Sequence, residues 1–184
     1  MNYDSYEDFS VELATDLIND YGTVPRQAAG RGDDPLPSLA AFMRDHHMDP
    51  SGLADGAEPA AQRLADRLHV VFTADDAHAV AVVNEVLTES GALPQLSGHD
   101  GEHWHLHYHP ADTRPLDRLA VTAAMGLATV LSTAGTRRLG HCEGIACRDV
   151  YVDTSRNNRR RFCDDGCANR VHVAAHRARR RSQS

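Results

Sequence analysis

All four cysteines of this 184-residue chain lie in its last quarter, in the pattern Cys142-x4-Cys147, fifteen residues, Cys163-x3-Cys167. Each short-spaced pair fits one tight turn, and the insert between the pairs is long enough for a hairpin that brings the two turns together. A tetrahedral Zn²⁺ site requires this spacing. Two disulfides or four unrelated thiols are the alternatives, but the clustering and the lack of a secretory signal before it favour zinc. Four thiolates leave no open position for water, so we predict one structural zinc ion.

The segment around the cysteines holds few large apolar side chains, so we expect it to need the metal in order to fold. The sequence of this segment predicts, in order, a zinc knuckle (142–147), two short strands (149–152 and 159–162) and a helix from Asp164 or Asp165 to about Arg181. A polar turn, 153–158, joins the strands, and Cys167 falls in the first turn of the helix. Knuckle, β-hairpin and helix together resemble a treble-clef arrangement.

The net charge of −7 conceals a division along the chain. Residues 1–136 hold seven arginines and 21 acidic residues, a formal charge of −14, whereas residues 137–184 hold twelve arginines and five acidic residues, a charge of +7. Zinc with four thiolates would lower the second figure by about two charges. Only the C-terminal segment is therefore expected to bind a polyanion, and the acidic segment is expected to repel DNA.

The predicted C-terminal helix has one apolar side and one basic side. Val171, Ala175 and Ala178 form a narrow apolar stripe at helical spacing, which we expect to lie against the finger hairpin. The basic arc outside fits a DNA groove or backbone, because arginine binds phosphates and guanine edges and asparagine pairs with adenine. The candidate DNA contacts are Arg156, Arg159, Arg160, Arg161, Asn169, Arg170, His176, Arg177, Arg180 and Arg181. A solvated helix face, or docking of the arc on the acidic segment, is the alternative interpretation.

Around the cysteines the chain resembles the CGNR zinc-finger proteins. The matching residues are Cys142, Cys147, the runs 151–157, 160–163 and 167–170, and 176–179. Their order and spacing make the resemblance specific over about the last 45 residues. Ala168 stands where the name motif has glycine, and Phe162 stands where tryptophan is usual. The resemblance implies an N-terminal ABATE domain and a role as a stress-induced transcription regulator.

Residues 1–136 predict a helical bundle with one small β-hairpin, followed by the finger in residues 137–184, so the chain is expected to be mainly α. Apolar residues recur at helical spacing in 9–21, 36–47, 58–72, 75–90 and 115–134. Asp75 is a predicted N-cap and Gly91 a predicted helix stop. Residues 23–37 are rich in glycine, proline and aspartate and predict a surface loop. A first helix with leucines and an asparagine, then a loop and a second helix, is similar to the ABATE domain.

Residues 101–110 alternate between two faces, with Trp104, Leu106 and Tyr108 on one. His103, His105, His107 and His109 are on the other. The alternation predicts a half-buried strand that pairs with residues 93–96 around the turn 97–101. Four imidazoles in line suggest a second metal site or a pH sensor, but no carboxylate or cysteine pattern accompanies them. A solvated polar face is therefore the preferred interpretation.

These patterns together predict a zinc-binding transcription regulator that is not an enzyme, because no nucleophile motif, phosphate loop or paired-carboxylate motif is present. The finger is expected to contact DNA, while the helical domain senses a small-molecule ligand or forms a homodimer. A zinc-stabilised module that binds protein or RNA is the alternative. The acidic N-terminus is unlike a signal or transit peptide, and no apolar run approaches about 18 residues. We therefore predict a cytoplasmic location and no membrane partner.

Overall fold

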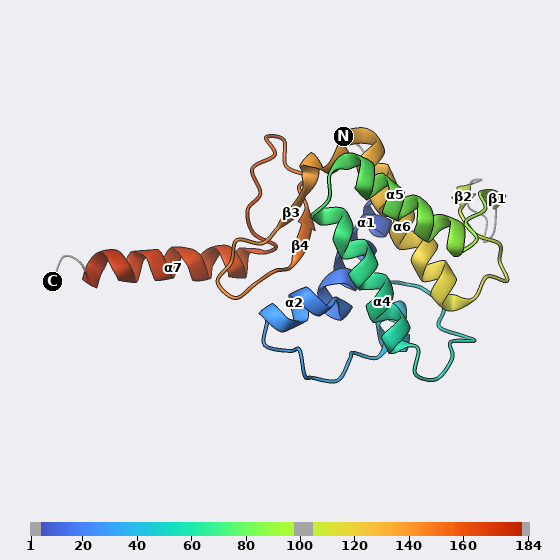
Figure 1. The fold of residues 1–184 in the computed structure, drawn as a ribbon, viewed down its shortest axis with the longest axis horizontal. Coiled ribbons are helices and arrows are strands. Elements are labelled where there is room, and N and C mark those ends of the chain that lie inside the picture. The colour runs from blue at the N-terminus through green and yellow to red at the C-terminus, as the bar shows by residue number, and fades with distance from the viewer. Residues whose placement is uncertain (1–4, 98–104, 182–184) are drawn as a thin grey trace.

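The computed structural model describes residues 5–97 and 105–181. Its helices are α1 (Ser5–Tyr21), α2 (Thr23–Ala28), α3 (Leu39–Asp45), α4 (Glu58–His69), α5 (Asp76–Glu89), α6 (Pro115–Ala134) and α7 (Asp165–Arg181), with 3-10 turns η1 (Val70–Phe72) and η2 (Gly135–Arg138). Strands β1 (Gln95–Ser97) and β2 (His105–His107) form one antiparallel pair, and β3 (Leu139–His141) and β4 (Val150–Val152) form another. The predicted mainly α class, with one small hairpin and a C-terminal finger, is confirmed. Figure 1 shows α7 extending away from the helices, with β3 and β4 lying between.

Helices α1 and α6 form the centre of the helical domain. The residues that the sequence places on their inner faces, among them Leu13, Leu17, Leu119 and Leu127, are fully buried. The two helices approach so closely at Gly126 that a Cβ built there would lie 2.4 Å from the carbonyl oxygen of Ser10. Glycine is therefore required at this position, because any side chain would push the two backbones apart.

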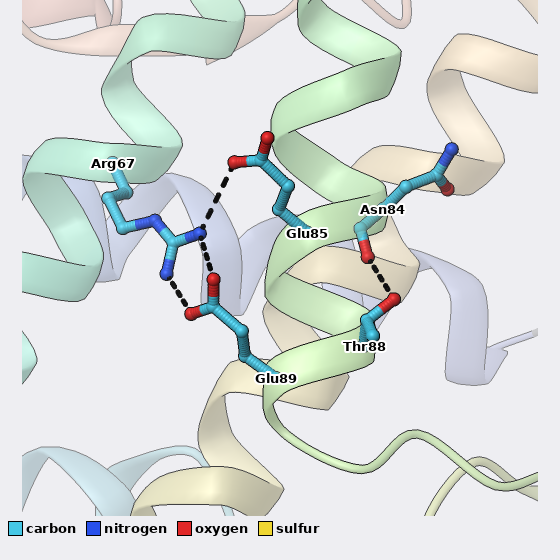
Figure 2. Close-up of polar contacts among 5 residues, drawn as sticks. All are labelled: Arg67, Asn84, Glu85, Thr88 and Glu89. Carbon is cyan, nitrogen blue, oxygen red and sulfur yellow. Dashed lines mark hydrogen bonds and ion pairs between the residues drawn. The ribbon is translucent and has the colours of Figure 1, made fainter.

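Helices α4 and α5 cover this pair, and both form as the sequence predicts. The Asp75 side chain accepts a hydrogen bond from the backbone N–H of His78 at 2.9 Å, so it is the N-cap of α5. Gly91, with φ at +69°, follows the end of α5. Arg67 of α4 reaches Glu85 at 3.6 Å and Glu89 at 2.5 Å on α5 (Figure 2). All three side chains are exposed, so this ion pair contributes little to stability.

The predicted loop 23–37 is partly wrong, because its first six residues form helix α2. The proline of α2, Pro25, lies in the first helical turn, where a missing N–H costs no intrahelical hydrogen bond. Arg26 of α2 is buried, and its guanidinium donates to the carbonyl oxygens of Arg31 and Asp34 at 2.9 and 2.6 Å. This buried arginine holds the rest of the segment as an ordered loop.

The predicted hairpin around residues 93–107 is present, with Leu96 opposite Leu106. On the predicted inner face Tyr108 is half-buried and Leu106 is 40% exposed, whereas Leu96, opposite Leu106, is 71% exposed. A two-stranded ribbon at the edge of the bundle has no second layer to cover it. His103 and Trp104 lie outside the described residues. Among the residues that the structure does describe, only the four cysteines form a group of three or more side chains placed to hold a metal. A solvated polar face therefore stays the preferred interpretation of the histidine strand.

The stretch Pro115–Arg138, α6 with η2, is a 24-residue helix with a mean hydropathy of 1.5, long and apolar enough by composition to cross a membrane. More than half of its apolar window, 56%, is buried inside the protein. Packing against α1 and α5 therefore accounts for its apolar character.

Strand β4 joins the finger to the helical domain. Val150 and Val152 belong to the same apolar core as α1 and α6. The Asn19 side chain of α1 accepts a hydrogen bond from the Val150 N–H at 2.7 Å and donates one to the Val150 carbonyl at 3.1 Å. Asn19 thus pairs the edge of β4 as a neighbouring strand would, and the finger is anchored to α1.

Candidate metal centre and basic helix

The four cysteines converge, with their sulfur atoms all within 4.8 Å of one another. The Cys163 Sγ lies 3.5 Å from that of Cys167 and 3.8 Å from that of Cys147. A tetrahedral zinc ion with bonds of about 2.3 Å places its sulfurs about 3.8 Å apart. Disulfide sulfurs would be about 2.05 Å apart, and all four cysteines are free, so the disulfide interpretation does not hold in this structure.

The surroundings of the four sulfurs also fit a bound zinc ion. A Cβ built on Gly144 would lie 3.1 Å from the sulfurs of both Cys142 and Cys167, which is a tight contact, so glycine fits this position of the knuckle best. The Gly144 N–H donates to the Cys142 sulfur at 3.3 Å, as backbone N–H groups do to a zinc-bound thiolate. Cys142, Cys147, Cys163 and Cys167 would therefore hold one Zn²⁺, which would supply structural cross-linking and no reaction chemistry.

The pKa values of the cysteines explain why their thiolates need a bound cation. Burial raises the pKa of Cys147 to about 12 and also raises the pKa of Cys163. The pKa of Cys142 is lowered: burial opposes this, but donors that include the Cys163 and Gly144 N–H groups favour its thiolate. Four neighbouring thiolates without a cation would repel one another, and a divalent ion removes that cost.

Helix α7 begins at the metal centre. The Asp164 side chain accepts a hydrogen bond from the Cys167 N–H at 2.6 Å, which confirms the predicted cap and fixes Cys167 in the first turn. The Arg170 guanidinium, one turn later, donates to the Cys167 sulfur at 2.6 Å. Arg170 therefore partly balances the negative charge of the thiolates and orients the ligand from outside the coordination sphere.

The strands of the finger differ from the prediction. Residues 159–162 are not a strand, and β4 pairs instead with β3, in the register Leu139 to Val152 and His141 to Val150. The hairpin therefore closes over the cysteine knuckle rather than over the polar turn. Residues 159–162 still lie beside the knuckle, because the Glu143 N–H donates to the Arg161 carbonyl at 2.9 Å.

Asp153 and Arg160 organise the segment between β4 and Cys163. The buried Asp153 carboxylate accepts from the N–H groups of Ser155 and Arg160, both at 2.8 Å. The Arg160 guanidinium donates to the carbonyls of Val152 (3.4 Å), Phe162 (2.9 Å) and Cys163 and lies over the Tyr151 ring. These contacts connect the end of β4 to a zinc-ligand residue.

The expected packing of the apolar stripe on α7 is wrong. Within α7, which the structure describes from Asp165 to Arg181, only Cys167 is buried. Val171 is half-buried, and Ala175 and Ala178 are exposed. Two alanines offer too little apolar area to hold the helix against the hairpin, so α7 extends away from the finger (Figure 1).

The ten candidate DNA contacts fall into two groups. Arg160, Arg161 and Arg170 already have partners inside the finger: backbone carbonyls, Glu143 and the Cys167 sulfur, respectively. Seven are exposed, two in the loop after β4 and five on α7: Arg156, Arg159, Asn169, His176, Arg177, Arg180 and Arg181. Helix α7, which carries the basic arc, extends away from the helical domain rather than docking on it (Figure 1).

Sequence reasoning missed several residues that build the site. Gly144 carried a signal, since a glycine two residues after the first cysteine is typical of a tight knuckle. Asp153 lies in the run that matches the finger family, but its role in holding Arg160 depends on the folded loop. Asn19 had no signal that could link it to Val150, 131 positions away.

A helical domain fused to a four-cysteine finger with a projecting basic helix defines a two-part zinc-finger protein. The family model of the ABATE domain, described as "Putative stress-induced transcription regulator", matches residues 12–134, and the CGNR zinc finger model matches residues 138–180. The chain belongs to the ABATE family, with a CGNR zinc finger at its C-terminal end. A search of curated proteins gave no match. Neither family description names an enzyme class.

Proposed function

We propose that this protein is a transcription regulator whose finger binds duplex DNA through α7, while its helical domain senses a small molecule or forms a homodimer. The observation that carries the proposal is the exposure of α7. A 17-residue helix that buries only Cys167 and ends in three consecutive arginines leaves most of its surface beyond Val171 available to a partner.

The dimensions and charge of α7 suit the DNA major groove. At 1.5 Å per residue the helix is about 26 Å long, and with side chains it is about 10–12 Å wide, close to the width of the groove. The side chains assigned to DNA are Asn169, His176, Arg177, Arg180 and Arg181 from α7, with Arg156 and Arg159 from the preceding loop. Arg160, Arg161 and Arg170 are assigned to holding the finger together, because their donors already have partners.

The helical domain has a net charge opposite to that of the finger, and this charge orients the protein on DNA. With a formal charge of −14 over residues 1–136, it repels phosphates from its own surface. Only the α7 end of the molecule can then approach a duplex closely. We place the division between the two functional parts between residues 136 and 137, inside η2. We expect a cytoplasmic protein that acts in a stress response.

The proposal is tested by fluorescence anisotropy with a labelled duplex selected from genomic fragments. Arg156, Arg159, Arg177 and Arg181 make no guanidinium contact with any described residue, so about four phosphates are neutralised and the log-log salt slope is about −4. An Arg177→Gln, Arg181→Gln double variant should weaken binding at least 10-fold and reduce the slope by about two. Arg63→Gln, an exposed arginine of α4, is the matched control and should leave both unchanged. No salt-dependent binding to any duplex would contradict the proposal.

A module that binds protein or RNA is the second candidate, and exposed apolar residues on the finger favour it. Ile145 at the tip of the knuckle is 63% exposed, and Val173 on α7 is 48% exposed. Such side chains are typical of protein contacts and are not needed for phosphates. Binding to single-stranded RNA or to a protein partner, with no binding to duplex DNA in the same buffer, would select this function.

A further inference from the structure

A cavity of about 740 Å³ lies between α1 and the finger. One wall is formed by α1, and the opposite wall by β4, the loop 153–156 and Arg160. Val130 of α6 and Arg138 of η2 contribute the remainder, and the zinc-ligand residue Cys163 is also part of the lining. A volume of this size is typical of small-molecule sites, which often form at the junction of two domains.

The α1 wall carries two carboxylates one helical turn apart, Glu12 and Asp16. Like charges at this spacing destabilise a helix. The Glu12 carboxylate accepts no hydrogen bond from any described residue, and Asp16 has only the His46 Nε2, at 3.5 Å. Burial raises the pKa of Asp16, and the neighbouring Glu12 raises it further. Folding thus leaves negative charge in this wall that a bound cation would balance.

The finger wall carries the opposite charge. Arg156 makes no hydrogen bond or ion pair with any residue that the structure describes. One nitrogen of Arg138, Nη1, donates to the carbonyls of Asp153 (3.0 Å) and Ser155 (2.5 Å), which leaves the other end of its guanidinium for a ligand. Arg160, in contrast, uses Nε and both Nη atoms on backbone carbonyls. Arg156 and Arg138, which have unused donors, therefore line the same cavity as Glu12 and Asp16.

We propose that this cavity binds a small zwitterion, of the class of free amino acids and short peptides, with its amine at Glu12 and Asp16 and its carboxylate at Arg156 and Arg138. The inference deepens the sensing role proposed above by giving it a site and a ligand class. Mixed walls exclude a purely cationic or purely anionic ligand, because either would leave one wall without a counter-charge. The valines of α1, α6 and β4 would contact its apolar part.

The cavity is positioned to affect the metal centre. A ligand seated on the loop 153–156 contacts the segment that Asp153 holds, and Asp153 in turn fixes the backbone of Arg160. The Arg160 guanidinium donates to the carbonyl of Cys163. One chain of contacts therefore leads from the ligand to a zinc-ligand residue, and from there to the start of α7.

The test uses the full zinc-loaded chain without DNA. Thermal melting is recorded with the twenty free amino acids and a panel of dipeptides, and with the N-acetylated and C-amidated form of each compound that binds. At about 100 times its dissociation constant, a binding zwitterion should raise Tm by about 5–10 °C, and its two blocked forms should not. No shift above about 1 °C across the panel, or equal shifts with the blocked forms, would overturn the proposal.

Variants of residues that line the cavity test whether the zwitterion binds there. Glu12→Gln and Arg156→Gln should each weaken the ligand at least 10-fold in calorimetry, because each removes a charge-assisted contact. Both side chains are exposed, so both variants should keep the wild-type zinc content, and neither should lower the ligand-free Tm. Asp55→Asn and Arg63→Gln, exposed residues of matched type outside the cavity, are the controls. Unchanged affinity in Glu12→Gln and Arg156→Gln would place any binding elsewhere and reject this site. DNA binding is measured separately without ligand, so the two proposals can fail independently.

Discussion

Asn19 provides the sharpest test of how the finger is attached to the helical domain. Its side chain makes two hydrogen bonds, at 2.7 and 3.1 Å, to the backbone of Val150, a residue that is only 1% exposed. In Asn19→Ala the N–H and the carbonyl of Val150 lose their partners. Each unsatisfied buried group costs about 1–3 kcal/mol, and water from the adjoining cavity replaces part of this, so we expect a loss of about 2–3 kcal/mol.

The expected result is a fall in Tm of about 5–10 °C, measured by circular dichroism with zinc present. Hydrogen exchange at the Val150 amide should become faster, while zinc content stays at the wild-type value because no sulfur is disturbed. Asn84→Ala is the matched control: Figure 2 shows its side-chain amide pointing away from the ion pair of α4 and α5. A Tm within about 1 °C of wild type in Asn19→Ala would refute the reasoning that this residue anchors β4.

Three further changes follow from single contacts. Gly126→Ala places a Cβ 2.4 Å from the Ser10 carbonyl oxygen and should lower the free energy of unfolding by about 3 kcal/mol. The expected readout is a fall in Tm of about 6–12 °C. A Tm equal to wild type would mean that α1 and α6 are not in contact there. Arg170→Gln removes a donor 2.6 Å from the Cys167 sulfur and should weaken zinc about 10-fold in competition with a metal indicator, whereas Arg177→Gln should not. Burial raises the pKa of Asp16 above 3.8, so its ionised form destabilises the fold at neutral pH. Asp16→Asn should therefore raise Tm at pH 7, and this gain should shrink as the pH falls towards 3.8. A lowered Tm at pH 7 would show that the ion pair with His46 dominates.

The parts of the fold that local patterns determine were predictable from the sequence. Apolar residues at helical spacing identified α1, α4, α5 and α6, and Asp75 identified the start of α5. Helix α2 was missed because glycine, proline and aspartate dominate its surroundings, although Pro25 in a first turn does not oppose a helix. Strand β3 was missed because its three residues include Gly140 and its partner lies beyond the knuckle.

The site was predictable in its ligands but not in its supporting contacts. Cysteine spacing is a local signal, so the four sulfurs were found, whereas the Asn19 contact with Val150 joins distant residues and appears only in the folded chain. The side of α7 that would pack was misjudged because helical spacing shows which residues share a face, not whether a partner surface reaches it. Two alanines and one valine did not provide enough area to fix that helix against the hairpin.

The structure and proposed role of the finger depend most directly on the presence of one zinc ion between the four sulfurs. Native mass spectrometry of the purified chain, with elemental analysis of the same sample, measures this. We predict one zinc per chain in the wild type, and none in a Cys147→Ser, Cys167→Ser variant. A wild-type chain that lacks zinc, or that carries the lower mass of two disulfides, would contradict the proposed metal centre and, with it, the support for α7.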